Sequence, residues 1–137
     1  MNVLYPAFTM MALTFYCLVR LGILRMNAVR SGEVDSRFYS LYRGYEEPEK
    51  LALYSRHVIH HFETPVLFYI LCITAFVTGQ GSVTVVGLAW AYVALRFVHS
   101  YVHLAGNIVP VRFRIFVVSM IVLALMWGVL LTGIMRQ

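Results

Sequence analysis

All five histidines of this chain fall in two short patches, and each patch also carries an arginine. Within each patch the polar side chains recur every three or four residues, which aligns them along one stripe of an α-helix. The stripes consist of Arg56, His60 and Glu63 in the first patch and of Arg96, His99 and His103 in the second. Two kinds of chemistry fit this set of groups.

The first is recognition of an anionic, peptide-like cofactor. Arginines bind carboxylates, in a bidentate manner where the geometry allows, and the Glu63 carboxylate can accept a hydrogen bond from an amino group. The second is a metal or haem site, because imidazoles and a carboxylate from two helices are suitable ligands. Its ligands would be His60, Glu63, His99 and His103, with His57 and His61 close by. The neighbouring arginines disfavour a bound cation, so we prefer the first chemistry and assign no metal.

The remaining reactive side chains have ordinary structural interpretations. His57 and His61 lie on a different helical face from His60, and we interpret them as polar residues at the membrane interface. Cys17 and Cys72 fall inside apolar runs, where a thiol usually packs as a small hydrophobe.

Four continuous apolar runs must position these side chains. Each run is close to the ~20 residues that an α-helix needs to cross a bilayer, whereas a barrel strand alternates over ~10 residues. The runs cover about residues 3–24, 57–78, 82–104 and 113–135. The sequence therefore predicts an all-α integral membrane protein, a four-helix up-down bundle that forms a single domain over residues 1–137.

Composition supports this class of protein. The chain is 61% hydrophobic and 12% charged, with a mean hydropathy of +0.76, whereas soluble domains are about a quarter charged. The net charge of +5 could suggest nucleic acid. However, the basic residues sit at loop edges rather than on one soluble face, so we expect membrane lipid and no nucleic acid as a partner.

Two of the charged residues lie deeper than the others, Glu63 on the second run and Arg96 on the third. A charge near the bilayer centre costs about 2.5–3.5 kcal/mol on insertion scales. We therefore expect Glu63 and Arg96 to face one another, a neighbouring subunit or a water-filled cleft.

The loops indicate an orientation. Four spans place both termini on one side, together with a short turn, and place the long loop of about residues 26–55 on the other side. The long-loop side carries Arg25, Arg30, Arg37, Arg43, Lys50, Arg56, Arg112 and Arg114, and the terminal side carries Arg136. The positive-inside rule predicts a cytoplasmic long loop, with the polar patches beside it and with non-cytoplasmic termini. Within this loop, Glu46–Glu49 contains the proline and carboxylates typical of a helix start.

At these residues the chain resembles the MAPEG family, membrane-associated proteins in eicosanoid and glutathione metabolism, and its bacterial-type members in particular. The family opens its second helix with Arg-x-x-x-Asn-x-x-Glu, follows an arginine of the third with His or Tyr and then Tyr, and enters the fourth with Pro-x-Arg. The matching positions are Arg56, His60 and Glu63, then Arg96, His99 and His103, then Pro110 and Arg112. The chain departs from the pattern at His60, where the family has asparagine, and at His103, where it usually has tyrosine.

The resemblance implies a homotrimer that binds glutathione between neighbouring subunits, near the cytoplasmic face of a bacterial inner membrane. It implies a glutathione-dependent transferase or peroxidase whose lipophilic substrates enter from the bilayer. The implied catalytic residue is Arg112, because an adjacent cation lowers the pKa of a thiol and so increases its nucleophilic form. The implied cofactor-binding residues are Arg25 (or Arg20), Arg56, His60, Glu63, Arg96, His99 and His103.

Two other hypotheses come from different classes. The histidine patches and the missing asparagine suggest a non-catalytic or His-rich metal- or haem-binding bundle that kept this fold. A third hypothesis is an accessory subunit of a larger membrane assembly.

Overall fold

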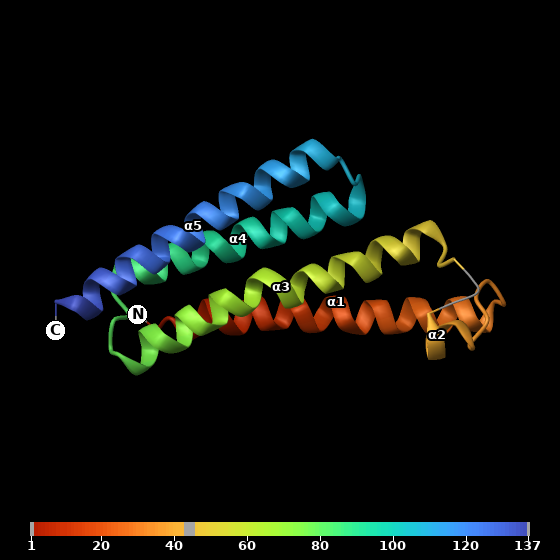
Figure 1. Ribbon diagram of the computed structural model, residues 1–137, viewed down its shortest axis with the longest axis horizontal. Helices are drawn as coiled ribbons and strands as arrows, with labels where there is room; N and C mark the ends of the chain where they lie inside the picture. Colours follow the sequence, from red (N-terminus) through yellow and green to blue (C-terminus); the bar gives the residue numbers. More distant parts are fainter. Residues whose placement is uncertain (1, 43–45, 137) are drawn as a thin grey trace.

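The computed structural model of the protein describes residues 2–42 and 46–136. Within these ranges the regular structure consists of helices, and no strand is present. The helices are α1 (Leu4–Arg30), α2 (Phe38–Leu41), α3 (Glu49–Val77), α4 (Val83–Ala105) and α5 (Val109–Met135). Apart from the single short turn of α2, they run alternately up and down along one long axis (Figure 1).

The four long helices are long and apolar enough to cross a membrane. The shortest, α4, has 23 residues, which at about 1.5 Å per residue exceeds the ~30 Å of a hydrocarbon core. Large apolar side chains on the outer faces, such as Phe15, Phe62 and Leu131, are exposed, as suits contact with lipid. The chain is thus an integral, multi-pass membrane protein, and the predicted all-α four-helix bundle is confirmed.

Local sequence explains where the helices begin and end. Pro48 immediately precedes α3 and Glu49 lies in its first turn, which confirms the helix start predicted there. The apolar run expected from residue 57 is therefore the inner part of a longer helix. α4 begins after Ser82, whose Oγ accepts a hydrogen bond from the backbone N–H of Val85 at 3.3 Å. The preceding turn contains Gly79 at φ +69°, a left-handed conformation that glycine adopts without steric cost.

The chain forms two antiparallel hairpins, α1–α3 and α4–α5 (Figure 1). α4 contacts both helices of the first hairpin and α5 contacts α3, while α1 and α5 share no contact among the described residues. Both termini and the α3–α4 turn lie at one end of the bundle, which we call the terminal end. The opposite end, which we call the loop end, carries α2 and the α4–α5 turn, and the two hairpins diverge toward it (Figure 1).

A tightly packed core joins the hairpins in the middle of the bundle and toward the terminal end. The rings of Phe68 on α3 and Tyr92 on α4 are stacked, with centroids 4.6 Å apart and an interplanar angle of 23°. Ala75, Ala89 and Met126 are also fully buried. Because this core fixes α4 against α3, the polar residues one to three turns nearer the loop end are held at defined depths.

Candidate functional site

A cavity of about 210 Å³ opens between α3, α4 and α5 on the loop-end side of the core. Four residues predicted from the sequence line it together: His60 and Glu63 from α3, His99 from α4 and Arg112 from α5. Its apolar wall is formed by Val109, Phe113 and Phe116. Three separate helices therefore deliver acidic, basic and imidazole groups to one small space.

Glu63 is held by its neighbour on the same helix turn. The Nδ1 atom of His60 lies 2.8 Å from Oε2 of Glu63, and both side chains are about half exposed. A protonated Nδ1 donates to the carboxylate in this geometry, which leaves Nε2 of the neutral ring free as an acceptor. The pair presents an acceptor and a negative charge at the mouth of the cavity.

Arg96 lies behind the cavity and is completely buried. Its Nη2 donates to the backbone carbonyl of His60 at 3.3 Å, while Nε and Nη1 have no hydrogen-bond partner. From the sequence we expected Glu63 and Arg96 to face one another, a neighbouring subunit or a water-filled cleft, and no direct contact between the two is present among the described residues. Instead, His60 stands between them, its ring bound to the carboxylate and its carbonyl bound to the guanidinium. A buried cation with two unfilled donors is costly, and an anionic ligand would relieve that cost.

Arg112 is positioned by the turn that precedes its helix. Its Nη1 donates to Oδ1 of Asn107 at 2.7 Å, and Asn107 adopts a left-handed conformation at φ +43°, which asparagine tolerates better than most residues. Pro110 occupies the first turn of α5, where its missing N–H is not needed. The guanidinium is thus tethered at the rim of the cavity and keeps other N–H groups for a ligand.

The two histidines of α4 lie close to the cavity. His99 and His103 are almost fully buried, and their ring centroids are 6.0 Å apart. The His103 ring also lies 6.1 Å from that of His60. Nδ1 of each ring lacks a partner. Of these two imidazoles, His99 lines the cavity, and His103 packs next to His99 and His60.

The two outer arginines predicted to bind a cofactor lie away from the cavity lining. Arg56 is exposed one helical turn before His60. Arg25 donates from Nη2 to Ser55 at 3.1 Å, its Nε lies 3.6 Å from Glu47, and its guanidinium stacks 5.2 Å from the centroid of Tyr39. Ser55 in turn donates to Glu47 at 2.9 Å. This network ties the end of α1 to the loop and to the start of α3.

The same network alters the ionisation of the loop tyrosine. Burial, and then the nearby Glu47 carboxylate, raise the pKa of the Tyr39 hydroxyl above its usual value. Tyr39 therefore stays neutral and stacks on the guanidinium as a π system, which supports a structural role for the contact.

Sequence reasoning missed a second cluster of functional groups. His57 and His61, interpreted as interfacial, are fully buried, and their Nε2 atoms lie 3.2 Å apart. Together with Cys17 from α1, they have potential ligand atoms that all lie within 4.8 Å of one another. This is the group of potential metal ligands that the described residues form, and it differs from the predicted set of His60, Glu63, His99 and His103.

A signal for that burial was present in the sequence. His57, His61, Pro65, Phe68 and Cys72 recur at helical spacing and are all buried. The stripe becomes purely apolar after its second member, so the two histidines begin the core-facing side of α3. Because the side chains of His57 and His61 are polar, their place in this buried stripe was not predicted from the sequence.

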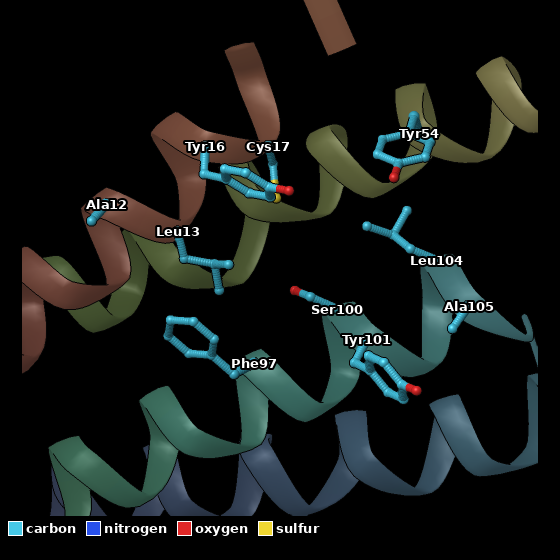
Figure 2. A pocket seen from close by; sticks show the side chains of 10 residues that line it. All are labelled: Ala12, Leu13, Tyr16, Cys17, Tyr54, Phe97, Ser100, Tyr101, Leu104 and Ala105. Carbon is cyan, nitrogen blue, oxygen red and sulfur yellow. The ribbon is translucent and has the colours of Figure 1, made fainter. Parts of the chain in front are cut away.

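A larger cavity of about 610 Å³ lies between the diverging hairpins and is mostly apolar (Figure 2). α1 contributes Leu13, Tyr16 and Cys17, and α4 contributes the longest stretch of the lining. The full set of lining residues is Ala12, Leu13, Tyr16, Cys17, Tyr54, Phe97, Ser100, Tyr101, Leu104 and Ala105. Cys17 belongs both to this lining and to the buried histidine cluster.

The chain matches a known family of membrane proteins. A sequence model of the MAPEG family matches residues 3–132, which is nearly the whole length. No curated protein and no solved structure matched the chain.

Proposed function

We propose, since this chain belongs to the MAPEG family, that the cavity lined by His60, Glu63, His99 and Arg112 binds glutathione. The family includes glutathione transferases and peroxidases. The protein would hold the tripeptide at the loop end of the bundle and present its thiol to lipophilic substrates that arrive through the bilayer.

The charges of the cavity lining carry this proposal, because Arg112 and Glu63 bring a cation and an anion to one small space. A carboxylate is the acceptor that a guanidinium binds best, and Arg96, buried outside the lining, adds a second positive charge nearby. Glutathione supplies two carboxylates and one ammonium group. Glu63, exposed at the mouth of the cavity, is suited to receive the ammonium group. The charges of the ligand and those of the cavity are therefore complementary.

Arg112 would act on the sulfur. A guanidinium beside the thiol favours the thiolate and lowers the pKa of the thiol toward neutrality. The thiolate then attacks an electrophilic carbon of the substrate, forms a carbon–sulfur bond, and the displaced electron pair takes up a proton or leaves with a leaving group. With a hydroperoxide, the thiolate would instead attack the terminal oxygen, break the O–O bond and release the alcohol, leaving a sulfenic acid. A second glutathione would then form the disulfide and release water.

Cavity size supports a site shared between subunits. Ligand pockets that bury most of a small molecule have volumes of roughly 300–1,000 Å³, whereas this cavity has about 210 Å³ within one chain. We propose that a neighbouring copy completes it in a homotrimer, as the family resemblance implied. The exposed Arg56, one turn nearer the loop end, would then contact glutathione held by the adjacent subunit.

We also propose an orientation. Basic residues concentrate at the loop end, and the positive-inside rule would place this end in the cytoplasm of a bacterial inner membrane. Glutathione is a cytoplasmic thiol, so the cavity would open toward its supply.

Calorimetric titration of detergent-purified protein with glutathione tests the proposal. We expect binding by the wild type, a loss of at least tenfold in affinity for Glu63→Gln and for Arg112→Ala, and unchanged binding for Arg114→Ala. Arg114 is a matched control because it is exposed two residues further along α5 and does not line the cavity. The absence of wild-type binding at millimolar glutathione, or equal affinities in all four proteins, would exclude this function.

A further inference from the structure

The group formed by Cys17, His57 and His61 is separate from the proposed glutathione cavity. None of the three lines that cavity, and they are 2%, 0% and 1% exposed. Thiolate and imidazole are ligands for copper and zinc. We propose that these three residues bind a transition-metal ion, and that the ion is copper(I).

The distances support coordination. Two nitrogens bound to one metal at about 2.0 Å lie roughly 3.3 Å apart in tetrahedral geometry and roughly 3.5 Å apart in trigonal geometry. The two Nε2 atoms are already 3.2 Å apart. The donor atoms of all three residues lie within 4.8 Å of one another, so the Cys17 sulfur is already close to both nitrogens.

Thr14 prepares His61 as a ligand. Its Oγ1 lies 3.1 Å from the carbonyl of Met10 and 3.0 Å from Nδ1 of His61. A hydroxyl has a single proton, and Oγ1 of Thr14 also lies 3.5 Å from the Tyr69 hydroxyl. We assign the Thr14 proton to the carbonyl one turn back on its own helix, so that the hydroxyl oxygen accepts from Nδ1–H of His61. This tautomer leaves a lone pair on Nε2, which points toward His57, and such an outer hydrogen bond is typical of metal-bound histidines.

His57 faces His61 through its Nε2 atom, and the two Nε2 atoms are 3.2 Å apart. In the absence of an ion, Nε2 of His57 must carry the proton that separates the two facing nitrogens. An ion bound between them would replace that hydrogen bond by two coordination bonds.

The net charge of the ligand set favours copper(I) over zinc(II). The ligand set contains one thiolate, two neutral imidazoles and no carboxylate, so it carries a single negative charge. Copper(I) would make the site neutral, whereas zinc(II) would leave a net positive charge in a low-dielectric interior, which is costly. On binding, the metal–sulfur bond forms and the thiol proton is released to solvent, while the oxidation state of the metal is unchanged.

The larger cavity gives the ion an entry route. Cys17 and Ser100 both line it, from α1 and α4 respectively (Figure 2). Oγ of Ser100 lies 3.4 Å from Nε2 of His61. The ligand group is thus one side chain away from a space that could hold a solvated or carrier-bound ion, and a bound ion would have one side open toward this cavity.

A competition assay tests the site. Purified full-length protein in thiol-free, anaerobic buffer is titrated against the copper(I) complex of bicinchoninate, and in parallel against a chromogenic zinc(II) chelator. We expect the wild type to withdraw a single copper(I) ion per chain. Cys17→Ala should abolish this, and Cys72→Ala should not, although Cys72 is equally buried. Thr14→Val should weaken binding by roughly 10–100-fold, since it removes only the outer hydrogen bond.

Circular dichroism, detergent gel filtration and glutathione titration of each variant serve as controls that the protein is still folded. A Cys17→Ala protein that keeps the circular dichroism and gel-filtration behaviour of the wild type but no longer binds copper(I) would support the site, whether or not the protein binds glutathione. Wild-type copper affinity in Cys17→Ala, or no withdrawal of either ion by the wild type, would overturn it. Binding of zinc(II) in place of copper(I) would overturn the choice of ion.

Discussion

The guanidinium of Arg96 donates to the backbone carbonyl of His60 at 3.3 Å, although the two residues lie on different helices. Through the ring of His60, whose Nδ1 is 2.8 Å from Glu63, this contact links a buried cation to an exposed carboxylate. The histidine therefore occupies the centre of the proposed site.

The first prediction concerns stability and binding at Arg96. Replacing a buried charge by an apolar side chain of similar volume is often neutral or stabilising, because it removes a desolvation cost. We expect Arg96→Met to keep or raise the unfolding temperature in detergent, while glutathione affinity falls at least tenfold, or about 1.4 kcal/mol. Thermal unfolding followed by circular dichroism and calorimetric titration measure the two effects. A variant that loses stability but keeps its affinity would show that Arg96 has a purely structural role.

The second prediction concerns the chemistry at Arg112. If its guanidinium stabilises the glutathione thiolate, Arg112→Ala should lower kcat by roughly a hundredfold with a model electrophile. Removing the guanidinium raises the pKa of the bound thiol. The remaining activity should therefore begin to increase at a higher pH than the activity of the wild type does. Arg112→Lys, which keeps the charge, should restore part of the rate at neutral pH. An unchanged pH profile in Arg112→Ala would exclude the thiolate role.

A third prediction concerns Arg25. The guanidinium is engaged by Glu47, Ser55 and the ring of Tyr39, so we expect its loss to affect the packing of the loop against α1. Since Arg25 remains partly exposed, Arg25→Ala should lower the free energy of unfolding by no more than about 1 kcal/mol. Limited proteolysis of the loop should become faster. A large loss of glutathione affinity with normal loop proteolysis would instead support the cofactor-binding role that the family resemblance implied.

The fourth prediction concerns the core that positions the site. Phe68 is fully buried against Tyr92, whereas Phe62, on the same helix, is 57% exposed. We expect Phe68→Ala to lower the free energy of unfolding by about 3–5 kcal/mol through lost packing and a residual cavity. Phe62→Ala should change it by less than about 0.5 kcal/mol. Unfolding in mixed micelles compares the two variants. Equal effects would mean that the interface between the hairpins does not set the stability of the bundle.

The amino-acid sequence alone determined the architecture and the end of the bundle near which the polar residues of α3, α4 and α5 gather. Continuous apolar runs of about 20 residues can span a bilayer only as helices, so the four spans could be predicted without knowledge of their packing. The proline and carboxylates at Glu46–Glu49 marked the start of α3, because helix-start signals are local. Spacing along α3 and α4 likewise placed His60, Glu63 and His99 on stripes that could share a cavity.

Only the tertiary structure decided which side chains meet. Arg96 bonds to the His60 carbonyl rather than to Glu63, and His57 and His61 turn inward to meet Cys17 from α1. Periodicity shows which residues share a face of one helix, but it carries no information on which neighbour that face contacts. That choice depends on how α1 and α4 pack against α3, and packing between membrane helices is decided by shape and by buried polar contacts rather than by hydrophobicity.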